Sequence, residues 1–164
     1  MDSIANSNGY TRARPKLIIM WSQPRHPYMN PTAPTIAVID DSPSVRQFFQ
    51  RCVEPLAVDF KAYASADEAM EYLRTHQPEL LFLDIIMPEK DGLTFLQELR
   101  RIAGQEHTKV IMISSKDYMQ DRAMAKKLGA VDFVAKPMYT QAIRDLIILH
   151  TGARQKQSKP AKDG

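Results

Sequence analysis

The sequence of 164 residues contains a single cysteine, Cys52, and no long hydrophobic run. One cysteine excludes a disulfide framework within the chain and is consistent with a reducing cytoplasm. A membrane-spanning helix needs about 18 or more apolar residues, and no segment approaches that length. The longest candidate near the N-terminus, residues 17–21, is also too short for the apolar region of a secretory signal, which has about 7–15 residues. We therefore expect a cytoplasmic protein without a membrane segment.

Charge is unevenly distributed along the chain, whose formal net charge is +3. Residues 1–34 hold four basic side chains and one acidic side chain, and residues 151–164 hold the same numbers. Residues 35–150 hold 14 basic and 17 acidic side chains, so the middle is mildly acidic. We expect a globular domain over residues 35–150 between an irregular, proline-rich basic leader and a disordered basic tail. The basic ends are either solvated or bind a weak anionic partner. Met29 is a candidate for the true start of the protein.

Short apolar runs alternate with helical periodicity across the expected domain. Continuous apolar runs, typical of strands buried on both faces, lie at residues 36–39, 80–83 and 110–113. Alternating segments, typical of strands near a sheet edge, lie at residues 58–61 and 131–133. Helices are expected at residues 43–56, 65–73, 93–102, 117–128 and 139–150. Ser42 and the capping-box residue Ser65 are suited to begin two of these helices, and Gly129 is suited to end the fourth.

Five strand–helix repeats predict a doubly wound parallel α/β sheet with helices on both faces. Ligands of such sheets bind beyond the carboxyl ends of the strands, at the point where the strand order reverses. Five polar side chains follow or end these apolar runs: Asp40, Asp41, Asp84, Ser114 and Lys136. Under the flavodoxin-like (βα)5 order 2-1-3-4-5, the first and third strands are neighbours. The three carboxylates would then converge, with the serine and the lysine beside them.

Three carboxylates in one place repel one another and favour binding of a hard divalent cation such as Mg²⁺. A carboxylate beside such a metal and a lysine ammonium can accept a phosphoryl group, because both cations neutralise charge on the transferred oxygens. The candidates for these roles are the carboxylates of Asp40, Asp41 and Asp84, one of them as the acceptor, and the ammonium of Lys136. A helix cap is the alternative role for the acidic pair Asp40 and Asp41.

The order of these motifs resembles the receiver domain of two-component response regulators over about residues 35–150. The matching motifs are Ile39–Ser42, Leu83–Pro88, Asp91–Gly92, Ile113–Ser115 and Lys136–Pro137. The resemblance implies a stand-alone receiver similar to chemotaxis response regulators. It implies a phosphoprotein of a phosphorelay that is no enzyme beyond self-phosphorylation and self-dephosphorylation.

The resemblance also assigns roles to single residues. Asp84 is implied as the phospho-acceptor, and Asp40, Asp41, Asp84 and the backbone carbonyl of Ile86 are implied as ligands of Mg²⁺. Ser114 is implied as the hydroxyl that bonds the phosphoryl group after its transfer. These assignments define the site that we expect at the ends of the strands.

The switch assignments come from the same resemblance. Lys136 is implied as the partner of the phosphoryl group, and its bond to Pro137 is often cis in the family. Phe133 occupies the position of the aromatic that turns inward when the hydroxyl of Ser114 moves. Met138 replaces an aromatic often found after this Lys-Pro pair in DNA-binding relatives, which points away from that subfamily.

Three departures from the family pattern concern the neighbours of the acceptor. Ile86, two residues after Asp84, cannot position an attacking water, and Lys116, two residues after Ser114, is not an acid. Slow hydrolysis of the phosphoryl group is therefore expected. Ser115 stands where the family usually has a small residue such as alanine, which should leave access to the phosphate nearly unchanged.

Only 14 residues follow His150, so we expect no fused DNA-binding or enzymatic domain. The expected partners are a sensor histidine kinase or phosphotransfer protein and a downstream protein. The latter would bind the surface formed by the fourth helix, fifth strand and fifth helix. A nucleotide P-loop, a dinucleotide fingerprint and a flavodoxin phosphate loop are absent after the first strand. Two alternatives remain: an adaptor that works without phosphorylation, and a phosphohydrolase with an aspartyl intermediate, which would usually carry an acid at the position of Ile86.

Overall fold

The computed structural model describes residues 33–116 and 118–157, in which strands and helices alternate. The strands are β1 (Thr35–Ile39), β2 (Asp59–Tyr63), β3 (Leu80–Asp84), β4 (Lys109–Ser114) and β5 (Asp132–Ala135). The helices are α1 (Pro43–Val53), α2 (Ala66–Leu73), α3 (Gly92–Leu99), α4 (Met119–Lys127) and α5 (Thr140–Thr151). No helix in the described ranges is both long and apolar enough to span a membrane.

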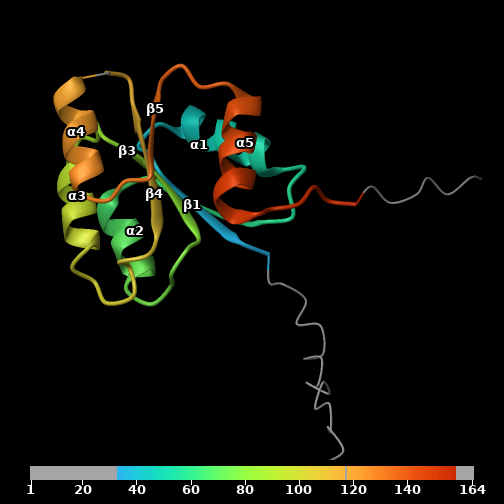
Figure 1. Cartoon of the computed structure of the whole chain (residues 1–164), viewed down its shortest axis with the longest axis horizontal. Coiled ribbons are helices and arrows are strands. Elements are labelled where there is room, and N and C mark those ends of the chain that lie inside the picture. The colour runs from blue at the N-terminus through green and yellow to red at the C-terminus, as the bar shows by residue number, and fades with distance from the viewer. Residues whose placement is uncertain (1–32, 117, 158–164) are drawn as a thin grey trace, which may run out of the picture. The chain divides into compact units, whose positions relative to one another are not determined.

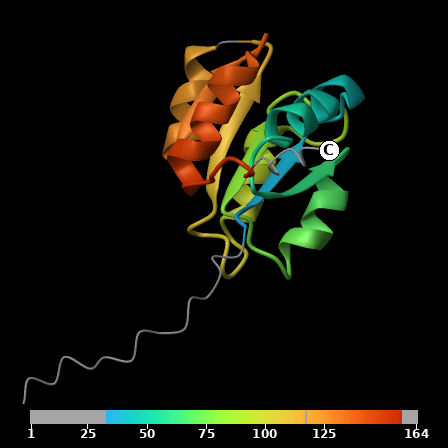
Figure 2. The same cartoon turned by 90° about the vertical axis from the view of Figure 1, so that its right-hand side faces the viewer.

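The five strands form one parallel sheet in the order β2-β1-β3-β4-β5, which confirms the predicted fold. Figures 1 and 2 show α1 and α5 on one face of the sheet and α2, α3 and α4 on the other. The order reverses between β1 and β3, because β2 lies on the outer side of β1. The carboxyl ends of β1 and β3 therefore lie side by side.

The burial of the strands follows their sequence patterns. All five residues of β3 are buried, and so are residues 36–39 of β1. The edge strands β2 and β5 contain no buried residue, as their alternating patterns predict. Successive residues of the central strands point to opposite faces, so each face of the sheet has its own hydrophobic layer. These two layers hold the central strand ends in fixed positions.

The starts of the helices agree only in part with the predicted caps. The Ser65 side chain accepts a hydrogen bond from the Glu68 amide at the start of α2, as a capping-box serine should. Ser42 stands at the N-cap position of α1, as predicted, but its side chain does not make the expected capping hydrogen bond. Its hydroxyl lies 2.9 Å from the hydroxyl of Ser44, while the Ser42 amide binds the Asp40 side chain.

Helix α1 ends at Val53, three residues before the predicted end. Pro55 accounts for this difference, because proline has no backbone N–H to donate the next helical hydrogen bond, although Glu54 before it still has helical dihedral angles. Leu56 is nevertheless buried, so its apolar spacing was informative about burial although it lies outside the helix. Gly129 follows α4 with a φ of +81°, as predicted for the left-handed end of that helix.

The chain after α5 corrects the prediction of a disordered tail from residue 151. Thr151 still belongs to α5, and Ala153 is buried. The Ala57 amide donates to the Arg154 carbonyl at 2.8 Å, and the Lys156 amide donates to the Pro55 carbonyl at 2.8 Å. The polar composition of this segment suggested solvation, but its backbone finds partners just before β2. The rest of the expected tail, residues 158–164, and the expected leader up to residue 32, with Met29, lie outside the described residues.

Candidate functional site

The sheet brings the predicted polar residues together at the carboxyl ends of four strands. Asp40 directly follows β1, Asp84 ends β3, Ser114 ends β4, and Lys136 directly follows β5. One oxygen each from Asp40, Asp41 and Asp84 lies within 4.8 Å of the others. In the part of the chain that the structure describes, residues 33–116 and 118–157, these three carboxylates are the group of at least three His, Cys, Asp or Glu side chains that lie close enough to share a metal ion.

Lys136 extends from the end of β5 to this acidic group. Its Nζ donates to Asp40 Oδ2 at 2.9 Å and lies 3.0 Å from Asp84 Oδ1. Its backbone amide donates to the Ser114 carbonyl at 2.8 Å, and the bond to Pro137 is cis, as the resemblance implied. One ammonium is thus shared by two buried carboxylates.

Burial dominates the electrostatics of Asp84, whose side chain is about 3% exposed. The pKa of this carboxyl is raised from 3.8 to about 6, and desolvation by burial is the largest cause. This value already includes the hydrogen bond and charge of Lys136, which lower the pKa, and the charges of Asp40 and Asp41, which raise it. Burial alone would lower the pKa of Lys136, but its contacts with Asp40 and Asp84 outweigh burial and raise it.

The donor set fits a hard divalent cation. The ammonium of Lys136 contacts Asp40 and Asp84, so one cation faces a group of three carboxylates, and burial raises the pKa of Asp84. Asp40 already binds Lys136 through one oxygen and the Ser42 amide through the other, whereas the Asp41 residue is exposed. A cation with a few carboxylate ligands and several waters, which Mg²⁺ prefers, suits this combination.

The loop after β3 passes very close to the start of α3. The Gly92 amide donates to the Ile85 carbonyl at 2.8 Å, and a Cβ atom at Gly92 would lie 2.1 Å from the Asp84 carbonyl oxygen. No larger residue fits this position without moving the loop. Asp91 caps α3 by accepting a hydrogen bond from the Leu93 amide at 3.0 Å. The Asp91–Gly92 pair therefore sets the path of the backbone that carries Asp84.

The remaining predicted residues lie around this centre. The Ser114 side chain is buried, and its Oγ accepts a hydrogen bond from the Lys116 amide at 3.0 Å. Ile86 follows β3 with 47% of its surface exposed. Phe133 is half-buried on β5 opposite Met112, so it lies on the same sheet face as Ser114.

Sequence reasoning did not single out Arg46. Its Nη1 donates to the backbone carbonyls of Asp40 at 2.7 Å and Asp41 at 2.9 Å. The available signal was a basic residue in the first turns of the helix that directly follows the acidic pair. That signal is weak, because exposed basic residues are common on helices.

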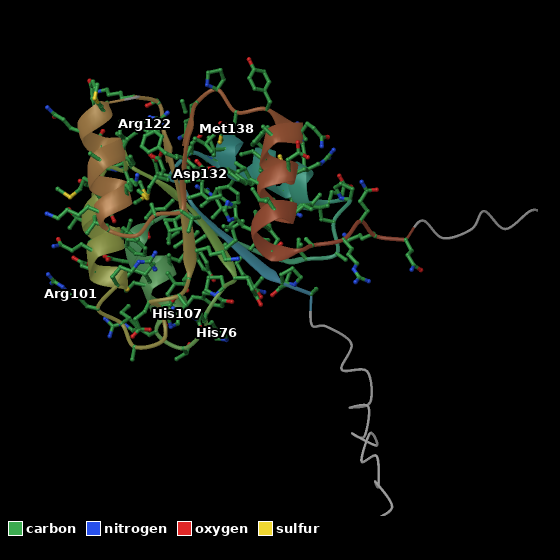
Figure 3. All side chains as sticks on the ribbon, viewed as in Figure 1. His76, Arg101, His107, Arg122, Asp132 and Met138 are labelled. Atoms are coloured by element: carbon green, nitrogen blue, oxygen red, sulfur yellow. The ribbon has the colours of Figure 1, made fainter. Side chains whose placement is uncertain are left out.

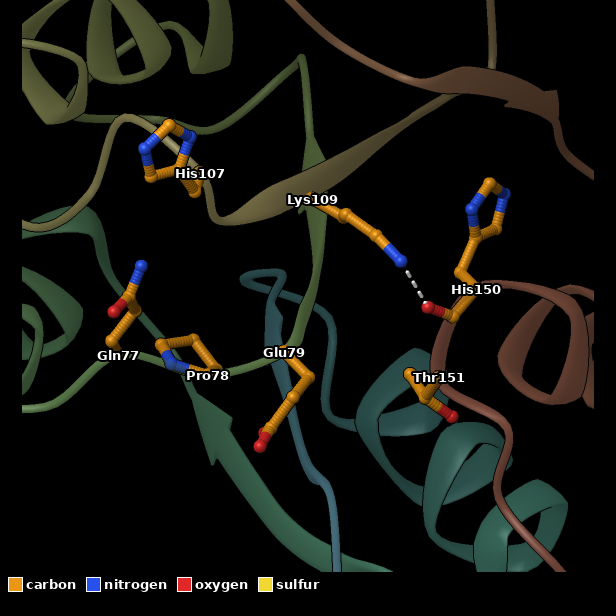
Figure 4. A pocket seen from close by; sticks show the side chains of 7 residues that line it. All are labelled: Gln77, Pro78, Glu79, His107, Lys109, His150 and Thr151. Carbon is orange, nitrogen blue, oxygen red and sulfur yellow. Dashed lines mark hydrogen bonds between the residues drawn. The ribbon is translucent and has the colours of Figure 1, made fainter. Parts of the chain in front are cut away.

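A second hollow lies at the opposite end of the sheet, before β3 and β4 (Figure 4). It has a volume of about 390 Å³ and is lined by Gln77, Pro78, Glu79, His107, Lys109, His150 and Thr151. The Lys109 ammonium donates to the His150 carbonyl, and Glu79 accepts a hydrogen bond from the Thr35 amide. These charged groups are already paired with backbone, and none of the predicted site residues lies there.

The fold agrees with comparisons to known families. The family model described as the response regulator receiver domain matches residues 36–148. The chain is 34% identical over 129 residues to "Response regulator Rre1" of Synechocystis, which covers 77% of this chain and 55% of that protein. It is 32% identical over 125 residues to a "Probable cyclic di-GMP phosphodiesterase" of Vibrio cholerae, and the match covers 76% of this chain and 28% of that protein. The chain thus spans about half or less of these relatives.

Solved structures share the fold. A CheY-like receiver domain protein from Methanospirillum hungatei has a TM-score of 0.66 and 18% identity, covering 70% of this chain and 90% of its own. The chemotaxis protein CheY4 of Vibrio cholerae, crystallised at low pH, has a TM-score of 0.68 and 19% identity. The match covers 72% of this chain and 98% of the CheY4 chain. At such identities the likeness shows the architecture alone.

Proposed function

Since the chain belongs to the response regulator receiver domain family, we propose that it is a phosphorylation-dependent switch of a two-component phosphorelay. A sensor histidine kinase or a phosphotransfer protein donates the phosphoryl group, and Asp84 accepts it. The observation that carries this proposal is the position of Asp84. Its buried carboxylate ends β3 between the ammonium of Lys136 and the carboxylates of Asp40 and Asp41.

The charges around Asp84 suit phosphoryl transfer. An ionised Asp84 oxygen attacks phosphorus, the bond from phosphorus to the histidine nitrogen of the donor breaks, and that nitrogen leaves with the bonding electron pair. Lys136 stabilises negative charge on the transferred oxygens. Asp41, the remaining lone pairs of Asp40 and Asp84, and the Ile86 carbonyl would hold Mg²⁺. When bound, that ion supplies further positive charge beside the phosphoryl group. In this proposal the chain catalyses only its own phosphorylation and dephosphorylation.

After transfer, the hydroxyl of Ser114 bonds the phosphoryl group and Phe133 follows it inward. Ser114 is buried at the end of β4, and β4 pairs with β5 so that both residues lie on one sheet face. Repacking of this region shifts the population of a pre-existing second conformation. The phosphoryl signal would thereby reach the surface formed by α4, β5 and α5.

We propose that this α4–β5–α5 surface binds a downstream protein. Figure 3 shows Arg122, Asp132 and Met138 along it, from α4 through β5 to the loop before α5. Large apolar side chains are exposed at its helices, with Met119 at 84% and Tyr139 at 74%. Exposed apolar groups rimmed by polar ones are typical of protein interfaces. A cytoplasmic location is part of the same proposal.

Labelling with acetyl phosphate tests the acceptor directly. With Mg²⁺ present, we expect the chain to gain one phosphoryl group, measured by intact mass. Asp84→Asn should abolish the gain, because the amide cannot act as the nucleophile. Asp67→Asn, at a side chain that is 83% exposed, should leave it unchanged. An unlabelled wild-type chain would favour an adaptor without phosphorylation, and a labelled Asp84→Asn chain would move the acceptor elsewhere.

The phosphorylated chain is expected to lose its phosphoryl group slowly. The exposed apolar side chain of Ile86 cannot orient an attacking water, and Lys116 offers no acidic group. Loss of the mass gain after removal of acetyl phosphate gives the rate. Ile86→Glu should shorten the half-life, since a carboxylate can position water, whereas a half-life of seconds in the wild-type chain would contradict the proposal.

A further inference from the structure

Arg46 joins the first turns of α1 to the backbone of the acidic pair. Its guanidinium nitrogen Nη1 donates to the carbonyl oxygen of Asp40 at 2.7 Å and to that of Asp41 at 2.9 Å. The residue is half-buried, and the mechanism above gives it no role. A charged donor that binds two adjacent carbonyls forms stronger hydrogen bonds than a neutral one.

These two contacts constrain the backbone that carries the carboxylates. A carbonyl held by Arg46 fixes the plane of its peptide, because the peptide unit is planar. Asp40 is held further by its amide, which donates to the Tyr63 carbonyl at 3.2 Å, and by the Ser42 amide bound to its side chain. By contrast, Asp41 is exposed, and its backbone carbonyl accepts a hydrogen bond from Arg46. Arg46 is therefore well placed to decide where the Asp41 side chain leaves the chain.

We propose that Arg46 is a positioning residue, which holds the acidic loop so that the carboxylates of Asp40 and Asp41 face Asp84 and can share Mg²⁺ with it. This inference rests on the proposed function of the site. A positioning role and charge repulsion predict opposite changes in Mg²⁺ affinity when Arg46 is replaced. A nearby cation repels Mg²⁺, so removing the guanidinium would tighten metal binding if charge alone mattered.

Mg²⁺ affinity of the full chain, measured by calorimetry with Mg²⁺ alone, tests the proposal. Arg46→Met keeps an unbranched side chain but removes both hydrogen bonds, and it should weaken binding about tenfold or more, as loss of groups that orient metal ligands typically does. Arg46→Lys keeps a donor and should fall between Arg46→Met and the wild type. Saturating Mg²⁺ should restore the rate of acetyl phosphate labelling in both variants.

Arg144 provides a matched control, because its guanidinium also binds two backbone carbonyls of α1. These are Cys52, at 3.0 Å, and Arg51, at 3.3 Å, at the far end of the helix from the acidic residues. Arg144→Met should lower the unfolding midpoint in chelator without changing Mg²⁺ affinity. Unchanged or tighter Mg²⁺ binding in Arg46→Met overturns the positioning role. If the wild-type chain does not bind Mg²⁺, both the metal site and the role of Arg46 are overturned. If the wild-type chain binds Mg²⁺ but is not labelled by acetyl phosphate, only the role of Asp84 as acceptor is contradicted.

Discussion

Asp84→Asn is expected to raise the free energy of unfolding by about 3 kcal/mol at about pH 7 without Mg²⁺. Burial raises the pKa of Asp84 from 3.8 to about 6, so the folded chain carries an ionised carboxylate in unfavourable surroundings. Asparagine is similar in shape and has no charge to desolvate, and it leaves Lys136 paired with Asp40. Removal of the proposed acceptor should therefore stabilise the fold.

The pH dependence of this effect follows from the direction of the shift. Because the folded pKa lies above the unfolded one, the stability that protonation of Asp84 contributes is fully present below about pH 4 and lost as the pH rises through about 6. Asparagine does not titrate in this range. The advantage of Asp84→Asn should thus be small near pH 4 and reach its full size above about pH 6.

Urea unfolding of both chains in chelator, between about pH 4 and pH 8, measures this difference. Asp67→Asn serves as the control, because an exposed carboxylate should change stability by no more than about 0.5 kcal/mol. Added Mg²⁺ should narrow the gap by binding the folded wild-type chain. Equal stabilities at all pH values would show that Asp84 is not ionised at a cost in the folded chain.

Gly92→Ala is expected to lower the free energy of unfolding by about 3 kcal/mol, the upper range for an added methyl group in a close-packed place. A Cβ at this position would lie 2.1 Å from the Asp84 carbonyl oxygen and 2.9 Å from the Ile85 Cα. Both are backbone atoms, so relief requires a shift of the loop or of the start of α3. Because this loop begins directly after Asp84, the substitution should also weaken Mg²⁺ binding.

Gly104→Ala separates this crowding from the general cost of replacing glycine. Gly104 has a φ of +89° and open space around its Cβ position, so alanine should cost only about 1 kcal/mol of backbone strain. It should leave Mg²⁺ affinity unchanged, since it lies away from the acidic residues. Equal losses of stability in the two variants would refute the close contact at Gly92.

Much of this architecture could be predicted from periodicity. Runs such as residues 80–83 are apolar throughout because helices cover both faces of the sheet, and the edge strand at residues 58–61 alternates because one face is wetter. Polar residues at the strand ends, such as Asp84, marked the site because they interrupt these runs. The strand order itself was taken from the flavodoxin-like fold class, since periodicity does not determine which strands pair.

Contacts between side chains and distant backbone could not be predicted in this way. Arg46 resembles any surface arginine in the sequence, and only the fold shows its guanidinium against two carbonyls. The motif containing Gly92 was recognised from the resemblance, but its steric reason depends on a loop path that no pattern describes. Residues 152–157 were assigned to a disordered tail because polar composition carries no information about backbone pairing.

The pairing of Gln155 with Leu56 also matters for anyone who shortens or extends this protein. A chain cut after Thr151 would uncover the place now filled by Ala153 and leave the Pro55 carbonyl and the Ala57 amide to water. A fluorophore or affinity handle attached beyond residue 157 would instead start from the end of the sheet opposite Asp84. Reporters attached there would leave the proposed phosphorylation site unmodified.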